Sequence, residues 1–487
     1  MLFDAFLQSF RREFPYELTS KQEEVVSSFF DFLFSSDRMG LYILRGYAGT
    51  GKTLLVSALV RVLKKIGRDV VLLAPTGRAA KVLSSGSGFS AYTIHKQIYR
   101  QRTMSSEVSH FDLDRNNYKN ALFIVDESSM ISARYDEHSI FGTGNVLHDL
   151  LNYIYRSPGC RALFVGDNAQ LPPVGEGDSH ALVPQYFSDM DFSVTGFQLL
   201  EVLRQEENSG ILQNATMLRS LMRSGDVFVP PVVQFSPFKD IHRLVGSDIV
   251  ETLQKSYEDV GYGETIVLTR SNKHANIYNR GIRSTFFDRE EGLQRGDMVM
   301  IVRNNYYWTE QLAEKLKKDN RSNDLPMDFI ANGDIAEIID VDEELDFYNL
   351  HFADVSLRFP DYNDFEMYHV RVILDVLTSD TPSLSPEQNQ LLFAGVSEDY
   401  ADERSKKKRM EKIRKDPNYN ALQIKYAYAV TCHKAQGGQW KNVFLDQGWL
   451  PSDGIDMNYY RWLYTAFTRA TQNLYLVSWP REQSAEE

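Results

Sequence analysis

The sequence predicts an α/β protein with two parallel-sheet domains and a small β-barrel inserted into the second of them. Three observations predict this fold class. From Leu41 to Asp167, short apolar runs alternate with longer helical stretches, as in βαβ units. A second region of the same kind opens near Arg204. Inside that region, short strand-like runs with turn residues between them extend from Asp297 to Leu374, which is typical of a barrel.

The first α/β region contains four apolar runs that predict strands buried on both faces. Each run ends in a polar or glycine-rich turn. Because ligands of open α/β sheets bind at the carboxyl ends of the strands, we expect the chemistry in these turns. The four runs are Leu41–Arg45, Asp69–Ala74, Ala121–Val125 and Ala162–Val165.

A phosphate-binding loop follows the first run. Gly46–Thr53 matches G-x-x-x-x-G-K-[ST] in length and residue type, with an apolar strand before it and a helical pattern after it. Glycines let the backbone wrap a phosphate, and the amides and helix N-terminus direct positive dipoles at it. We expect Lys52 to reach the β- and γ-phosphates of ATP and Thr53 to hold Mg²⁺. The other predicted nucleotide contacts in the loop are Gly46, Ala48, Gly49, Thr50 and Gly51.

An acidic pair closes the third run. Asp126 is the expected Mg²⁺ carboxylate, and Glu127 is the expected base that polarises the attacking water. Alone, such a pair is also typical of a surface turn. After a complete phosphate loop it favours hydrolysis, because a module that only binds nucleotide needs no base.

The second α/β region and its insertion complete the predicted architecture. Thr265–Thr269 and Val443–Leu445 are the clearest strands of the second sheet. The predicted divisions are a first domain at 1–203, a second domain at 204–295 and 420–487, and an inserted barrel at 296–419 with a helical arm at 385–419.

Composition limits the class of protein. Only two cysteines occur, which excludes a disulfide framework and favours a reducing cytoplasm. No run reaches the ~18 apolar residues of a membrane span, so we expect no membrane partner. The net charge of −13 argues mildly against a nucleic-acid partner, although a sliding protein needs only a local basic channel.

Further segments stand in order along the chain with the phosphate loop. They are Leu18–Gln22, Ala74–Lys81, Thr93–Lys96, Asp126–Met130, Gly166–Val174, Leu203–Gln205, Thr269–Asn272, Tyr426–Gln439 and Tyr464–Ala470. Together they resemble the RecD/Dda-type DNA helicases, the 5′-to-3′ branch of helicase superfamily 1. The resemblance covers most of the chain, and Gly166–Val174 is close to diagnostic.

The resemblance implies two RecA-like domains and an ATP- and Mg²⁺-dependent DNA helicase that acts in repair, recombination or replication. It implies Gln22 as the adenine contact, Gly437 as a further nucleotide contact and Gln170 as the γ-phosphate sensor. Arg204 and Arg469 are the implied arginine fingers. The implied DNA contacts are Thr76, Arg78, Lys81, His95, Pro172, Pro173, Thr269, Arg270, His433 and Lys434.

The resemblance also implies partners. They are single-stranded and duplex DNA and ATP, with a monomer as the expected state and replication or repair proteins as candidate partners.

Some alternatives stay open at this point. A strand-separating hairpin, or pin, is expected within 97–120, and without it the chain would be a translocase on DNA or RNA that does not unwind. A nucleotide-gated binding module is a second alternative, which Glu127 disfavours. Two weaker signals favour structural readings. Tyr306–Trp308 is more typical of barrel packing than of base stacking. The basic run Lys406–Lys415 is more typical of a solvated helix face than of a contact to DNA phosphates.

Overall fold

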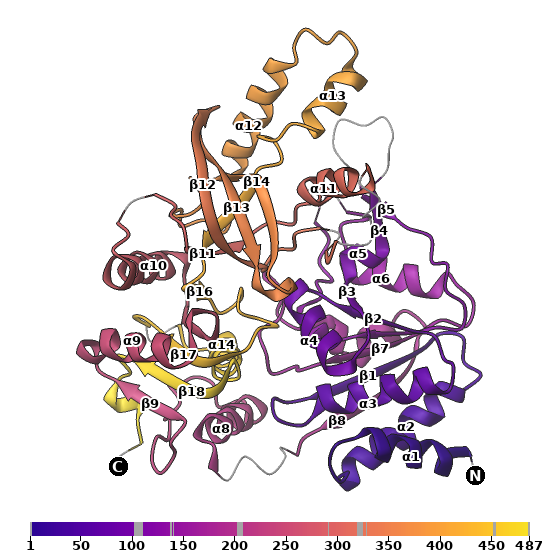
Figure 1. Cartoon of the computed structure of the whole chain (residues 1–487). Helices are drawn as coiled ribbons and strands as arrows, with labels where there is room; N and C mark the ends of the chain where they lie inside the picture. The colour runs from indigo at the N-terminus through magenta and orange to yellow at the C-terminus, as the bar shows by residue number, and fades with distance from the viewer. Residues whose placement is uncertain are drawn as a thin grey trace.

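The computed structural model describes residues 2–101, 111–136, 139, 141–201, 208–290, 292–318, 325–327, 329–450 and 454–485. Two α/β domains lie side by side, and a barrel with a projecting arm sits above them (Figure 1). The predicted fold class is confirmed. No helix in these ranges is both long and apolar enough to cross a membrane.

The first domain is a six-stranded parallel sheet in the order β3-β2-β6-β7-β1-β8. Its two faces bury alternate residues of the same strands: Tyr42 and Leu44 pack against one set of helices, and Leu41 and Ile43 against the other. The predicted burial on both faces is therefore confirmed. The strands are β1 (Gly40–Gly46), β2 (Val70–Ala74), β3 (Ala91–Thr93), β6 (Leu122–Val125), β7 (Arg161–Gly166) and β8 (Ser193–Leu199).

Helices cover both faces of this sheet. Helix α2 begins with a capping box in which the Thr19 hydroxyl accepts from the Gln22 amide and the Gln22 side chain accepts from the Thr19 amide. The helices are α1 (Leu2–Glu13), α2 (Ser20–Phe34), α3 (Lys52–Lys65), α4 (Gly77–Ser87), α5 (Ile94–Ile98), α6 (Val146–Tyr155) and α7 (Pro184–Ser188).

The second domain is a five-stranded parallel sheet in the order β16-β10-β17-β18-β9. Its strands are β9 (Ile241–Leu244), β10 (Thr265–Thr269), β16 (Ala429–Thr431), β17 (Trp440–Asp446) and β18 (Ala470–Val477). Its helices are α8 (Gly210–Ser224), α9 (Ile249–Val260), α10 (Asn272–Phe287) and α14 (Met457–Phe467).

The insertion is a closed barrel of β11 (Met298–Ile301), β12 (Ile335–Phe347), β13 (Leu350–Phe359), β14 (Phe365–Ile373) and β15 (Leu422–Tyr426). Strand β15 lies beyond residue 419, where we expected the insertion to end. Its apolar run leads directly into β16, and nothing in the local pattern separates a last barrel strand from a first sheet strand. Helix α11 (Tyr307–Lys318) follows β11.

The predicted arm is a pair of helices, α12 (Pro386–Asp399) and α13 (Lys406–Arg414), at the top of Figure 1. The lysines of α13 are exposed, as the structural reading predicted, whereas Arg409 and Arg414 are half-buried. Lys412 pairs with Glu403, and Lys415, just after the helix, pairs with Glu411. Within 97–120, β4 (Tyr99–Gln101) and β5 (Phe111–Leu113) pair antiparallel, and residues 102–110 lie outside the described ranges.

Candidate active site and nucleic-acid groove

The phosphate loop connects β1 to α3, as predicted. Gly49 and Gly51 have φ of 78° and 79°, a region that side chains rarely adopt. A Cβ atom on Gly46 would lie 2.8 Å from Thr50 Oγ1, so this turn also requires glycine. Lys52 Nζ donates to the Tyr47 carbonyl at 2.9 Å. The loop thus has the tight geometry that the motif predicts, with Lys52 beside it.

The acidic pair lies at the end of β6, two strands from β1. Asp126 is buried, and burial together with the Glu127 carboxylate raises its pKa to about 7. A buried carboxylate in this state gains from a nearby cation. Asp126 oxygens and the exposed Thr53 hydroxyl are the hard ligands that Mg²⁺ prefers, and so the donor set fits that ion. The described residues contain no cluster of three or more metal-ligating side chains, so phosphate and water oxygens would complete the shell.

Gln170 lies in the turn after β7 and is almost fully buried. Its Oε1 atom has no hydrogen-bond partner within the described part of the chain. A buried amide oxygen without a partner costs stability, which is acceptable at a site that a water or substrate group completes. This placement is consistent with the predicted role at the γ-phosphate.

Gln22 has a similar orphaned atom. The capping box uses its Oε1, which accepts from the Thr19 amide at 3.1 Å. Its Nε2 is buried and finds no acceptor among the described residues. The free amide hydrogens suit an adenine nitrogen, and the capping box holds the side chain in place.

The two domains meet directly beside the loop. The Leu171 amide donates to Thr465 Oγ1 at 2.8 Å, and Gln436 Nε2 donates to the Leu171 carbonyl at 2.8 Å. Tyr464, the neighbour of Thr465 on α14, lies against the loop itself. Segments that the sequence places almost 300 residues apart are therefore in contact at the turn that carries Gln170.

Of the two predicted arginine fingers, Arg469 lies within the described residues and Arg204 lies outside them. Arg469 is 3% exposed and points into its own domain, donating to the Thr465 and Gly438 carbonyls at 3.0 and 3.1 Å. In this conformation the Arg469 guanidinium is bound by carbonyl oxygens of its own domain and does not extend toward the first domain.

A different arginine lies near the loop. The Arg219 guanidinium, on α8 of the second domain, stacks over the Tyr47 ring at 4.1 Å. The sequence analysis did not find Arg219, because it belongs to no motif and its proximity to the loop arises only from the packing of two domains.

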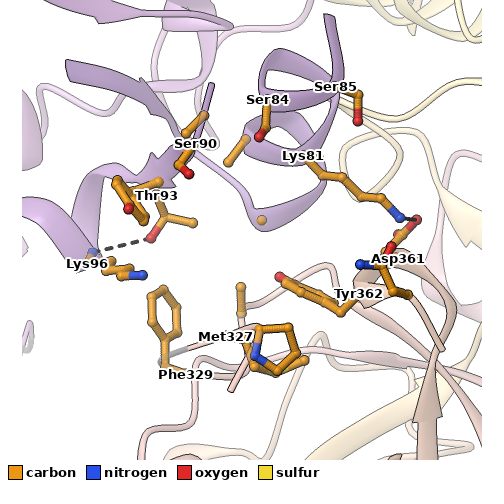
Figure 2. A pocket seen from close by; sticks show the side chains of 17 residues that line it. Lys81, Ser84, Ser85, Ser90, Thr93, Lys96, Met327, Phe329, Asp361 and Tyr362 are labelled. Atoms are coloured by element: carbon orange, nitrogen blue, oxygen red, sulfur yellow. Dashed lines mark hydrogen bonds and ion pairs between the residues drawn. The ribbon is translucent and has the colours of Figure 1, made fainter. Parts of the chain in front are cut away.

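A groove of about 370 Å³ lies between the first domain and the barrel (Figure 2). Lys81, Ser84 and Ser85 of α4 line one side, with Ser90, Thr93 and Lys96 close by. Phe329 and Tyr362, from the barrel side, line the other. Hydroxyl and ammonium groups facing aromatic rings are what a single strand requires, since phosphates and bases take different partners.

The predicted DNA contacts divide into groups. Lys81 lies in the groove, where its Nζ pairs with Asp361 of the barrel at 3.2 Å. Thr76 caps α4, and its Oγ1 would be 3.2 Å from a Cβ on Gly437, so Gly437 lies against the start of α4. Arg78 bridges the domains: it stacks on the Trp440 ring at 4.1 Å and donates to the Gln439 carbonyl at 3.0 Å.

Other predicted contacts are occupied by structural roles. Thr269 is fully buried, and its hydroxyl donates to the Ser271 carbonyl. His95 packs on Tyr99 and Phe141, and burial lowers its pKa to about 4, so it is neutral. Pro172 is buried and Pro173 half-buried.

Arg270 and His433 are exposed, as a contact to DNA requires. Lys434 is half-buried, and its Nζ has no partner among the described residues. Burial, with the Lys425 charge as a second cause, lowers the pKa of Lys434 to about 7.

Aromatic rings join the β4–β5 hairpin to the insertion. Phe111 of β5 lies 4.8 Å from the Tyr306 ring, which stacks at 4.7 Å on Phe329. Tyr306 therefore packs, as the structural reading of 306–308 expected. Tyr306 packs on two parts of the molecule: on Phe111 of the hairpin and on Phe329 of the insertion.

Comparisons with known proteins agree with this geometry. Residues 17–227 match the AAA domain family, and residues 426–477 match the UvrD-like helicase C-terminal domain. The ATP-dependent DNA helicase dda of Enterobacteria phage T4 is 25% identical over 454 residues, covering 89% of this chain and 93% of that protein. The ATP-dependent RecD2 DNA helicase of Deinococcus radiodurans is 32% identical over 176 residues, covering 36% of this chain and 21% of that protein.

Solved structures of Pif1 helicases are also similar to this chain. The Bacteroides Pif1 helicase in complex with ADP-AlF3 and ssDNA has a TM-score of 0.45 and 15% identity, covering 97% of this chain and 95% of that chain.

Proposed function

We propose that this chain, which belongs to the RecD/Dda type of superfamily 1 helicases, hydrolyses ATP to move along single-stranded DNA and unwind duplex DNA. The observation that carries the proposal is the phosphate loop at the contact between two α/β domains, with a groove between the first domain and the barrel. A motor needs this arrangement, because hydrolysis must change the contact between the two domains that grip the strand.

At the ATP site, the loop amides and Lys52 bind the phosphates, and Thr53 and Asp126 hold Mg²⁺, which neutralises phosphate charge when bound. Glu127 accepts a proton from the attacking water, and the free Oε1 of Gln170 orients it. Gln22 holds the adenine. Arg219 is the candidate for charge stabilisation across the cleft in this conformation, and Arg204 and Arg469 remain candidates in a closed one.

The strand follows the groove of Figure 2 and continues over the second domain. Lys81 and the hydroxyls of Ser84, Ser85 and Ser90 contact phosphates, and Tyr362 offers a ring to a base. Lys434, Arg270 and His433 extend the phosphate contacts. Contacts of this kind read no sequence, so binding should be sequence-tolerant.

The β4–β5 hairpin is the proposed pin. Its base is braced by Tyr306 through Phe111, which favours unwinding over translocation alone. The direction of movement is proposed as 5′-to-3′, on the family likeness alone. Mg²⁺-ATP and DNA are the proposed ligands, and a monomer in the cytoplasm is the proposed working form.

The test is ATP hydrolysis without nucleic acid and with single-stranded DNA, single-stranded RNA or duplex DNA, with Lys52→Ala as the control. We expect strong stimulation by single-stranded DNA that the control lacks. Strand separation is then measured on duplexes with a 5′ or a 3′ tail. Hydrolysis that no nucleic acid stimulates would refute the motor, and stimulation without separation of either duplex would leave a translocase.

A further inference from the structure

We propose that Tyr464 is a positioning residue that connects occupancy of the phosphate loop to the second domain. Its phenol oxygen accepts from the Ala48 amide, and a phosphate oxygen of ATP would compete for that amide and displace the phenol. This inference rests on the proposed ATPase function and adds a residue to which its motif alone assigns no role.

One hydroxyl group joins three segments. The Ala48 amide, in the loop after β1, donates to Tyr464 Oη at 2.9 Å. The same Oη donates to Asp167 Oδ2, after β7, at 2.5 Å. Because Tyr464 comes from α14, this pair of hydrogen bonds ties two adjacent strand ends of the first domain to the second domain.

The bond to Ala48 is the exchangeable one. The hydroxyl has a single proton and gives it to Asp167, so toward Ala48 it can only accept. Burial, with the Asp167 carboxylate as a second cause, holds the pKa of Tyr464 well above its usual value, so the phenol stays protonated. A charged phosphate oxygen accepts an amide hydrogen more strongly than a neutral phenol does. The exchange therefore favours the phosphate.

The position of Ala48 points to the terminal phosphate. The amides at the start of α3, at Lys52 and Thr53, lie at the other end of the loop. Ala48 lies toward the turn that carries Asp167 and Gln170, the predicted γ-phosphate sensor. ATP should displace Tyr464, and ADP should not.

The neighbouring contact would survive the exchange. Thr465 Oγ1 accepts from the Leu171 amide at 2.8 Å, one helical position from Tyr464 and at the same turn. ATP binding would thus release the Ala48 bond and keep the neighbouring bonds between the domains, from Tyr464 to Asp167, from Leu171 to Thr465 and from Gln436 to Leu171. The phosphate loop alone would lose its tie to the second domain.

The experiment compares Tyr464→Phe with Tyr460→Phe. Tyr460 lies on the same helix, is equally buried, and donates to the Val229 carbonyl at 2.7 Å within the second domain. Binding of ADP and of a β,γ-imido ATP analogue is measured by calorimetry, and melting temperatures verify that both variants fold. We expect Tyr464→Phe to tighten the ATP analogue by roughly three- to tenfold, the value of one hydrogen bond in the free state, with ADP unchanged. Tyr460→Phe should change neither.

Unchanged or weaker binding of the ATP analogue by Tyr464→Phe would overturn the proposal, as would equal tightening of ADP. Wild-type hydrolysis is measured in parallel. If it is absent, the proposed function fails, and if it is normal while the variant binds like wild type, only this inference fails.

A second measurement keeps the hydroxyl in place, in case Tyr464→Phe does not fold. 3-Fluorotyrosine is incorporated at position 464 alone, and its ¹⁹F resonance is recorded. We expect the resonance to shift with the ATP analogue and to stay unchanged with ADP. A resonance that neither nucleotide moves would overturn the proposal.

Discussion

Binding of single-stranded DNA should depend on pH through Lys434. Its pKa is lowered to about 7 in the free protein, so the ammonium loses its proton in the neutral range. A DNA phosphate beside it favours the charged form and returns the pKa toward the ordinary value of ~10.4. Binding therefore takes up a proton at neutral pH, and affinity falls as pH rises through 7.

The size of the effect follows from the charged fraction of Lys434 in the free protein. With a pKa of about 7, that fraction falls from about 90% at pH 6 to about 10% at pH 8, so affinity should fall about tenfold over this range. The other groups that face Lys434 do not reverse the sign: Lys425 is a second cation, also with a pKa lowered to about 8, and it bonds to the Val376 and Ser379 carbonyls.

The assay is fluorescence anisotropy with a labelled oligonucleotide at constant ionic strength across this pH range. Lys434→Arg keeps the charge at every pH and should bind with a flat profile. Lys434→Ala should bind more weakly, also with a flat profile, and with a salt slope smaller by about one. If Lys434→Arg retains the wild-type pH dependence, the reasoning about this buried ammonium is wrong.

Three other variants test the site and the fold. Glu127→Gln should lower hydrolysis by roughly 10²- to 10⁴-fold and leave single-strand affinity intact, and single-turnover ATPase measurements with binding curves would reveal any drop in affinity that contradicts this. Tyr306→Ala should slow strand separation severalfold and keep DNA-stimulated hydrolysis, because each aromatic pair that Tyr306 forms stabilises the hairpin by ~0.5–1.5 kcal/mol. The control is Tyr368→Ala, at an exposed position. An equal decrease of strand separation and hydrolysis in Tyr306→Ala would show a general defect. Asp297→Ala removes the carboxylate that accepts two 3.0 Å hydrogen bonds from the buried Arg283 guanidinium. We therefore expect chemical denaturation to show that the free energy of unfolding falls by ~3–5 kcal/mol, and a decrease below about 1 kcal/mol would contradict this estimate.

The parts of the site that lie in one short segment could be predicted from the sequence. The phosphate loop requires particular residue types at fixed spacing, because Gly49 and Gly51 adopt positive φ and Lys52 follows directly. Four of the six strands of the first sheet could be predicted for the same reason, since each is one apolar run that ends in a polar turn. The other two, β3 and β8, are short or largely polar and were not predicted.

Contacts between distant segments could not be predicted. Arg219 lies over Tyr47 only because α8 packs beside the loop, and no local pattern marks it. Thr269 has the residue type of a phosphate contact, but the Ser271 carbonyl takes its hydroxyl. The motif that contains Arg469 predicts that its side chain extends toward the first domain. Here its guanidinium donates instead to three acceptors of its own domain, on Thr465, Gly438 and Thr468. Residue type and spacing do not determine which of several partners a side chain chooses.

The barrel is joined to the second domain by both of its ends. Strands β11 and β15 pair antiparallel, and Asp297, just before β11, accepts from Arg283 of α10 and from the Tyr428 hydroxyl just after β15. We therefore expect the insertion to move together with the second domain. The insertion contacts the first domain through the Lys81–Asp361 ion pair and through the Phe111 and Tyr306 rings. A movement of the insertion would either break these contacts or displace the residues of the first domain that form them. If the two domains close on ATP, the barrel would transmit that movement to the β4–β5 hairpin. The displacement at the hairpin would be larger than at the ATP site, because the hairpin lies farther from the axis of rotation.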